Sequence, residues 1–278
     1  MHWDGRTWRT VDLPFARPGY LLAVSAAHGE VWAAGAQKFG RRERPLILHF
    51  ANGAWTQQTI PFLFAYDEIQ QVLAASDHDV WVIANRQRHR TTPYGSIIAH
   101  WDGQTWRRIP MPFGRFDPPS GFAATSFTNA WAVGSYADRY CTLRAHSRTI
   151  AAHWNGHRWQ VTPTPIIAPD ALLSGVQIEP DGTAVAMGVA GTVTLGSTTC
   201  RWTPHSSFSI GSKEPDLIFE RWDGHRWSLT GRQRANGYLG MFNVAGAATT
   251  GADWFVSGSL INHYADGRWF HDLPPSPQ

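Results

Sequence analysis

The sequence contains only 2 lysines and 2 cysteines in 278 residues, and its hydrophobic runs are short. No run approaches the roughly 18 consecutive apolar residues that a membrane-spanning helix needs, so we expect no membrane insertion. Cys141 and Cys200 can form at most one bridge, which excludes a zinc quartet and a disulfide framework. The first ten residues, MHWDGRTWRT, lack the apolar region of a signal peptide, so we expect any export signal to be missing from this chain.

Charged residues are also scarce, at 16% against 43% hydrophobic residues, which excludes a disordered tail or a coiled coil. What the sequence has instead is 22 arginines and 15 tryptophans, and aromatic residues reach 13%. Aromatic side chains suit pleated surfaces better than helices. The net charge is only +3, so nucleic acid is a weaker candidate partner than a small anionic ligand, because binding it would require a local basic patch.

Common catalytic motifs are absent from the sequence. There is no Gly-Xaa-Ser-Xaa-Gly elbow, no HExxH and no phosphate-binding loop. We therefore expect no cofactor and no metal site, and the sequence favours a binding protein over an enzyme.

Two short motifs alternate along the chain. The first occurs as HWDGRTW (2–8), HFANGAW (49–55), HWDGQTW (100–106), HWNGHRW (153–159), RWDGHRW (221–227) and HYADGRW (263–269). The second occurs as EVWAAG (30–35), DVWVIA (79–84), NAWAVG (129–134), the degraded TAVAMG (183–188) and ADWFVSG (252–258). Alternation at roughly 40–50 residues is typical of a propeller or a solenoid.

Each repeat divides into four strand-sized pieces with an Asp-Gly or Asn-Gly turn between the third and fourth. Four antiparallel strands per repeat predict an all-β β-propeller in a single domain, 1–278. Five complete repeats are expected, at about 19–64, 67–113, 119–165, 171–231 and 243–278. Residues 1–15 supply only a hairpin, the half of a further repeat. We therefore expect a ring of five or six blades. Two further possibilities stay open: residues 1–15 pair with a strand of a second chain, or the chain is a piece of a longer array of such repeats.

The alternating VWAVG-like and HWNGxxW-like motifs resemble those of Trp-rich bacterial β-propeller repeat proteins, most of which are uncharacterised and exported. The resemblance covers nearly the whole chain. It implies the propeller fold and carries almost no functional information.

A residue type present in every repeat is first of all a structural one. The repeated histidines are His2, His49, His100, His153 and His263, with Arg221 in the fourth complete repeat. Each belongs to a different repeat, too far from the others to share the ~2 Å bonds of one metal ion. We therefore expect hydrogen-bonding roles for them, and cross-strand packing for the repeated tryptophans.

Function is expected where the repeats differ, in the connections between second and third strands. These include 37–45, 85–96, 135–149 and the segment from Val189 to Pro215. Guanidinium groups bind carboxylates and sulfates, and aromatic rings pack against sugar faces. The sequence thus favours a non-catalytic module that binds a glycan or another anionic or polyhydroxylated ligand; solvated loop charges, and an array domain that binds nothing small, are the alternatives. The candidate ligand-binding residues are Arg42, Arg44, Arg88, Arg90, Tyr94, Tyr136, Arg139, Tyr140, Arg144 and Trp202.

The alternative function is a polysaccharide hydrolase or lyase that works in the central funnel. Its candidate catalytic residues are Asp67, Asp117 and Asp170, which precede the first strands of successive repeats. Such chemistry needs two carboxylates about 5 to 9 Å apart.

The two cysteines lie in equivalent connections of consecutive repeats. A bridge between Cys141 and Cys200 would constrain two long connections that are otherwise costly to order, by ~1–2 kcal/mol per residue. We predict this disulfide, and with it a secreted or cell-surface location. Two free thiols in a cytosolic protein are the alternative.

Overall fold

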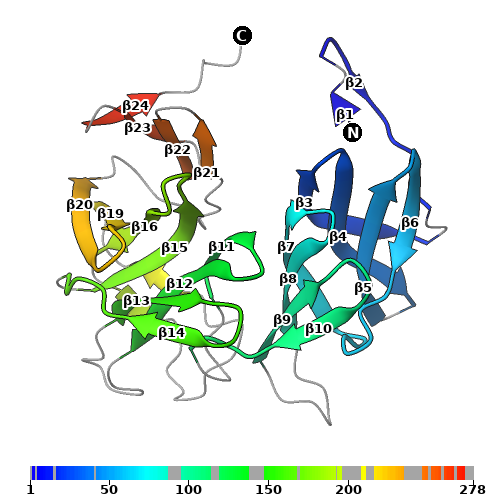
Figure 1. Ribbon diagram of the computed structural model, residues 1–278, viewed down its shortest axis with the longest axis horizontal. Coiled ribbons are helices and arrows are strands. Elements are labelled where there is room, and N and C mark those ends of the chain that lie inside the picture. Colours follow the sequence, from blue (N-terminus) through cyan, green and yellow to red (C-terminus); the bar gives the residue numbers. More distant parts are fainter. Residues whose placement is uncertain are drawn as a thin grey trace. The chain divides into compact units, whose positions relative to one another are not determined.

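The computed structural model describes residues 2–3, 5–14, 17–40, 42–86, 95–113, 119–137, 147–167, 170–191, 193–195, 208–210, 216–234, 246–249, 252–257, 260–265 and 268–272. These residues form β-strands joined by turns and contain no helix (Figure 1). Accordingly, the described part of the chain holds no helix with the length and hydropathy needed to cross a membrane.

Four-stranded antiparallel sheets follow one another along the chain, each with its strands in sequence order. Blade 1 consists of β3 (Gly19–Ala27), β4 (Glu30–Phe39), β5 (Arg42–Ala51) and β6 (Ala54–Gln58). Blade 2 consists of β7 (Asp67–Ser76), β8 (Asp79–Arg86), β9 (Gly95–Trp101) and β10 (Trp106–Ile109). Blade 3 consists of β11 (Gly121–Ser126), β12 (Asn129–Ala137), β13 (Ser147–Trp154) and β14 (Trp159–Thr162).

Two further sheets complete the set. Blade 4 consists of β15 (Ala171–Ile178), β16 (Ala184–Ala190), β19 (Asp216–Trp222) and β20 (Trp227–Arg234), with the small hairpin β17 (Val193–Leu195) and β18 (Phe208–Ile210) inserted in it. Blade 5 consists of β21 (Gly246–Thr249), β22 (Ala252–Ser257), β23 (Leu260–Ala265) and β24 (Arg268–Asp272). A lone hairpin, β1 (His2–Trp3) with β2 (Trp8–Arg9), precedes them. The predicted β-propeller architecture, with five complete repeats after a half repeat, is confirmed.

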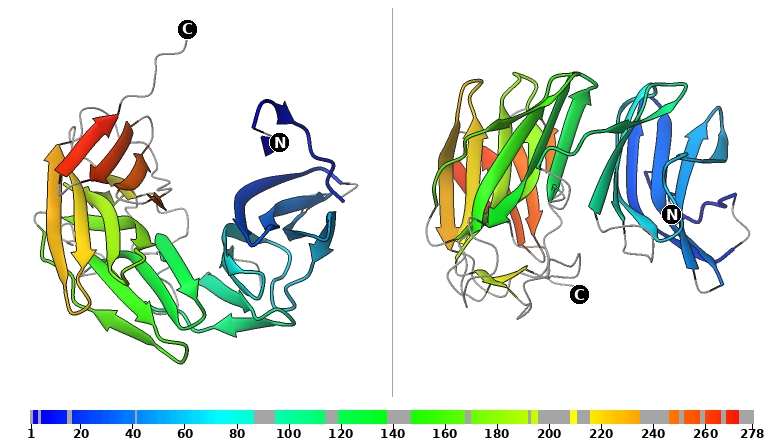
Figure 2. Two further views of the ribbon diagram at one scale, coloured as in Figure 1. Left: turned by 45° about the horizontal axis from the view of Figure 1, so that its top comes forward. Right: turned by 90° about the horizontal axis from the view of Figure 1, so that it is seen from below.

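The chain divides into two compact units, 1–109 with blades 1 and 2, and 110–278 with blades 3 to 5. In the first unit β7 packs across β3, β4 and β5, so blade 2 lies face to face on blade 1. In the second unit β15 packs in the same way across β11, β12 and β13, and β21 packs on β15 (Figure 2). The expectation of a single domain stays a prediction.

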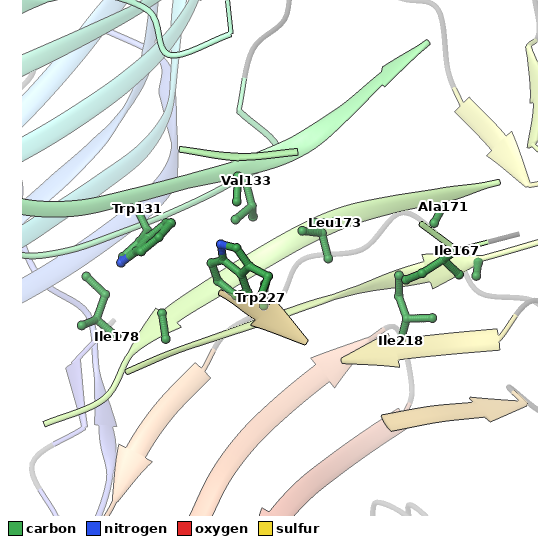
Figure 3. Packing of buried hydrophobic residues seen from close by; sticks show 12 residues of the cluster. Trp131, Val133, Ile167, Ala171, Leu173, Ile178, Ile218 and Trp227 are labelled. Atoms are coloured by element: carbon green, nitrogen blue, oxygen red, sulfur yellow. The ribbon is translucent and has the colours of Figure 1, made fainter. Parts of the chain in front are cut away.

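Tryptophans fill the space between blades 1 and 2 and the space between blades 3 and 4. The ring of Trp32 in blade 1 lies edge-on to Trp106 of blade 2, with centroids 5.8 Å apart. Trp131 of blade 3 meets Trp227 of blade 4 at 5.0 Å and nearly the same right angle. Figure 3 shows Trp131 and Trp227 facing each other between the strands of the two blades. Edge-to-face packing of large buried rings stabilises these contacts beyond the area that they bury.

The hairpins between third and fourth strands have the predicted turn chemistry. Gly103, Gly156 and Gly224 have φ angles of +91°, +91° and +98°, which residues other than glycine rarely adopt. The residue before each glycine, such as Asp102, accepts backbone N–H groups two and three residues further on. These hydrogen bonds hold the pKa of Asp102 below its usual value. The repeated Asp and Asn residues are thus turn residues.

One predicted loop is much shorter than expected. The segment 37–45 was expected to be a long basic loop, but β4 continues to Phe39 and β5 starts at Arg42. Only residues 40 and 41 connect them, and Gly40 has a φ of +65°. Because the turn takes two residues, Arg42 and Arg44 lie on a strand and are held in fixed register with β4.

Candidate functional site

The repeated histidines of blades 1 to 3 each contact a polar residue at the start of the second strand of their own blade. The distances from Nε2 are 2.7 Å for His49 to Glu30, 2.8 Å for His100 to Asp79 and 2.8 Å for His153 to Asn129. In blade 4, Arg221 donates to the Thr183 hydroxyl, which occupies the equivalent position, at 2.9 Å. Sequence analysis had not singled out these polar partners, although each stands two residues before the tryptophan of the repeated motif or its replacement, Val185.

The same histidines pack on the tryptophans opposite them. The His49 ring stacks on Trp32 with centroids 3.9 Å apart and planes at 13°. His153 lacks a carboxylate partner, and burial lowers its pKa. Within the described ranges there is no group of three or more His, Cys, Asp and Glu side chains that could hold a metal ion. These contacts hold the imidazole rings of the described histidines in position within their own blades.

A cavity of about 370 Å³ lies at one end of blade 1, in the first unit. The end of β4, the start of β5 and the end of β6 meet there because neighbouring strands are antiparallel. The connection from blade 1 to blade 2 completes the wall. Polar groups in the lining include the side chains of Gln37, Arg44, Gln57 and Gln58, and two aromatic rings, Phe39 and Phe64, join them.

Two arginines lie over one aromatic ring beside this cavity. The guanidinium carbon of Arg44 is 4.6 Å from the centroid of Phe39, and that of Arg17 is 4.8 Å from it. Both arginine residues are exposed, and neither is paired with a carboxylate among the residues that the structure describes. Contact with an aromatic face attracts each cation, and it also brings two positive charges close together.

A third arginine near the cavity is neutralised. Arg86 binds Asp67 through both branches, with Nε at 3.0 Å from Oδ1 and a terminal nitrogen at 2.8 Å from Oδ2. The Asp67 side chain is 3% exposed and also accepts the backbone N–H of Phe64. The pair ties β7 and β8 to the connection between blades, and the Arg86 guanidinium lies 5.3 Å from the Phe64 centroid. Asp67, a candidate catalytic residue, is therefore fully engaged in holding this end of blade 2.

Two glutamates converge on one hydroxyl at the same end of the unit. The Tyr20 hydroxyl is 2.9 Å from a carboxylate oxygen of Glu43 and 3.0 Å from one of Glu68. Burial, followed by these hydrogen bonds, raises the pKa of Tyr20. The phenol therefore stays protonated and acts as a donor. Nothing in the sequence pattern pointed to this cluster, because its three members come from β3, β5 and β7.

The remaining candidates divide between described and undescribed positions. Asp170, in the second unit, is 5% exposed and accepts the backbone N–H of Ser147 at 2.8 Å. Tyr136 is 38% exposed near the end of β12, opposite Arg148 of β13. The candidates outside the described residues are Arg88, Arg90, Tyr94, Asp117, Arg139, Tyr140, Cys141, Arg144, Cys200 and Trp202.

Glu220, on β19, is an unusual buried charge in the second unit. Its side chain is fully buried, and no described residue lies within 3.5 Å of either carboxylate oxygen as a hydrogen-bond partner. Burial raises its pKa to about 7, and the nearby Thr149 hydroxyl offsets this only in part. Glu220 is therefore largely protonated in the folded protein below neutral pH.

Comparisons with known proteins identify no family for this chain. Neither family models nor curated proteins match it. Among solved structures, the chain is similar to the GH74 xyloglucanase from Xanthomonas campestris, with 12% sequence identity and a TM-score of 0.33. That likeness covers 96% of this chain and 57% of the xyloglucanase chain, so the chain spans little more than half the length of its neighbour.

Proposed function

We propose that this chain is a non-catalytic recognition module that binds a glycan or another anionic, polyhydroxylated ligand at the cavity end of blade 1. The observation that carries the proposal is the cavity itself, whose 370 Å³ lie within the range of about 300–1,000 Å³ of known ligand sites. The Gln57 amide can donate to and accept from sugar hydroxyls, and the amide oxygens of Gln37 and Gln58 can accept from them. The free guanidinium of Arg44 adds a group suited to carboxylates and sulfates.

Two candidate catalytic carboxylates support binding over catalysis, because both already serve the fold. Asp67 is paired with Arg86, and Asp170 accepts a backbone N–H of β13. A carboxylate held in this way is not free to activate water or to protonate a leaving group.

The test is a glycan array probed with the intact chain, whose fold is checked by circular dichroism. The array carries neutral and acidic oligosaccharides of matched length. We expect binding to a subset of glycans that is saturable and competed by the free oligosaccharide. A folded protein with no signal above background on any glycan would contradict the proposal, and would favour the array domain that binds nothing small.

One observation favours a second candidate function, a polysaccharide hydrolase. Glu43 and Glu68 each accept a hydrogen bond from the Tyr20 hydroxyl, at 2.9 and 3.0 Å, which brings two carboxylates close to each other, as glycoside hydrolysis requires. Release of reducing ends from a polysaccharide, lost in both Glu43→Gln and Glu68→Gln, would establish it. Activity that survives either change would exclude this pair.

A further inference from the structure

The geometry points to a specific ligand class for the blade 1 cavity: an acidic saccharide whose carboxylate or sulfate is bound by Arg44, with Phe39 as the residue that positions the guanidinium. This inference rests on the proposed glycan-binding function and deepens it. It assigns anion binding to the Arg44 side chain and not to the neighbouring arginines.

The electrostatic argument begins with the Arg17, Phe39 and Arg44 group. Two guanidinium carbons lie within 4.8 Å of one ring centroid, and no carboxylate among the described residues compensates them. Their mutual repulsion is relieved when an anion enters, whereas a neutral ligand leaves it unchanged. The ring also fixes the Arg44 guanidinium before binding, so less side-chain freedom is lost when the ligand binds.

The nearby carboxylates do not oppose an anion at this position. Glu43 is the neighbour of Arg44 on β5, and adjacent residues of a strand point to opposite faces. Its carboxylate is instead bound to the Tyr20 hydroxyl. Asp67 is buried and neutralised by Arg86. Among the described residues that line the cavity, Arg44 is therefore the one uncompensated charge, and it lies together with amide groups.

The length of the lining suits a saccharide better than a bare inorganic anion. Gln37 lies directly opposite Arg44 in the β4–β5 register, and Gln57 and Gln58 reach the cavity from the end of β6. The amide nitrogens of Gln37 and Gln58 donate to the Arg17 carbonyl oxygen and the Thr56 hydroxyl. One guanidinium suffices for a carboxylate, so the Gln57 amide and the amide oxygens of Gln37 and Gln58 are left to recognise hydroxyl groups beside it.

The experiment compares two probes and two variants by isothermal titration calorimetry. The probes are an oligogalacturonate and the same oligomer with its carboxylates methyl-esterified. The variants are Arg44→Gln and its matched control Arg108→Gln. Arg108 lies on β10 of blade 2, in the same unit, and is also exposed, but it is absent from the cavity lining. If Arg44→Gln fails to fold, an Arg17→Gln variant tests the anion site in its place, because Arg17 lies over the same Phe39 ring.

We expect the acidic probe to bind at least tenfold more tightly than its methyl ester, and this preference to weaken with salt. Arg44→Gln should lose at least tenfold for the acidic probe and change little for the ester, while Arg108→Gln stays within twofold of the parent. Phe39→Leu should give a smaller loss, about threefold, because the guanidinium is no longer held in place.

The possible failures are distinguishable. Equal losses in Arg44→Gln and Arg108→Gln would mean diffuse attraction to the basic surface of the unit, which overturns the assigned site and leaves glycan binding standing. Equal affinity for acid and ester would overturn the acidic ligand class alone. Binding of neither probe, together with an empty glycan array, would overturn the proposed function and this inference together.

Discussion

At one position of the third strand, the residues of different blades make the same side-chain contact, although the residue types of the two partners change. His49 and His100 meet a carboxylate, His153 meets an amide, and Arg221 meets the hydroxyl of Thr183. In each case a nitrogen donor of the third strand reaches the first residue of the second strand or, in blade 4, the residue just before it. A polar group near a hydrophobic core needs a partner, and several donor–acceptor pairs satisfy this need equally well. What repeats is thus the hydrogen bond.

Glu220 is a buried carboxylate that lacks this compensation among the described residues, and it should make stability depend on pH. Its folded-state pKa of about 7 is above the ordinary 4.5, so the folded state binds more protons than the unfolded state between these values. The free energy of unfolding should therefore fall as pH rises from about 4.5 through 7, by roughly 3 kcal/mol if the whole shift is expressed.

Urea unfolding of the parent and of Glu220→Gln at pH 5 and pH 8 measures this effect. The amide does not titrate, so the variant should gain stability relative to the parent at pH 8 and show a much smaller difference at pH 5. A stability difference that is the same at both values would show that Glu220 does not titrate in this range.

Within the elements, three glycines at one position of the repeat have different surroundings. A Cβ atom on Gly35 would lie 2.0 Å from the Tyr20 carbonyl oxygen, and one on Gly188 would lie 1.9 Å from that of Leu172. Both face a bulge in the first strand of their blade, between Leu21 and Ala23 or between Leu173 and Gly175. At Gly134 of blade 3, the nearest atom would be 3.6 Å away, an ordinary contact.

This difference predicts contrasting effects for the same substitution. Gly35→Ala and Gly188→Ala should destabilise the protein by at least ~1–3 kcal/mol, because the backbone of the first strand must move. Gly134→Ala should be nearly neutral and serves as the matched control. Thermal unfolding of the three variants checks this, and a Gly134→Ala variant as unstable as Gly35→Ala would contradict the assigned geometry.

The predicted disulfide joins two of the connections between second and third strands. Cys141 and Cys200 both lie outside the described residues, so the bridge and the exported location remain proposals. We expect a Cys141–Cys200 peptide pair, closing a loop worth about 3–4 kcal/mol in the chain-entropy model. Mass spectrometry of non-reduced peptides detects it. Two alkylatable thiols in protein purified under oxidising conditions would refute the bridge and remove the main argument for secretion.

On the scale of the whole molecule, the amino-terminal segment is expected to protect an exposed blade face. Leu13 packs against Ala33, Leu46 and Leu48 of blade 1. Leu13→Ala should cost about 1–2 kcal/mol because the side chain is only partly buried, and deletion of residues 1–15 should cost more. Melting temperature and light-scattering mass report both effects, with Ile166→Ala, whose residue is 83% exposed, as the control. An unchanged melting temperature and mass after the deletion would show that the segment stabilises nothing.

Local patterns by themselves determined the blade architecture of this protein. Strand alternation and the Asp-Gly or Asn-Gly turn act over a few residues, so the repeated motifs at spacings of 42 to 68 residues predicted four-stranded blades, five complete repeats and the half repeat. The structural role of the repeated histidines followed from the same repetition. Arg44 was also among the residues that the sequence placed in the candidate site.

The tertiary structure decided which charges are free. Arg44 and Arg86 look alike in the sequence, as basic residues near the same kind of connection. Arg86 is neutralised by Asp67, 19 residues away, whereas Arg44 lies over Phe39 beside the cavity. The same holds for Tyr20, Glu43 and Glu68, which the packing of blade 2 on blade 1 brings together. Side-chain pairing depends on distances across strands and blades, and a pattern that is local in sequence carries no information about those distances.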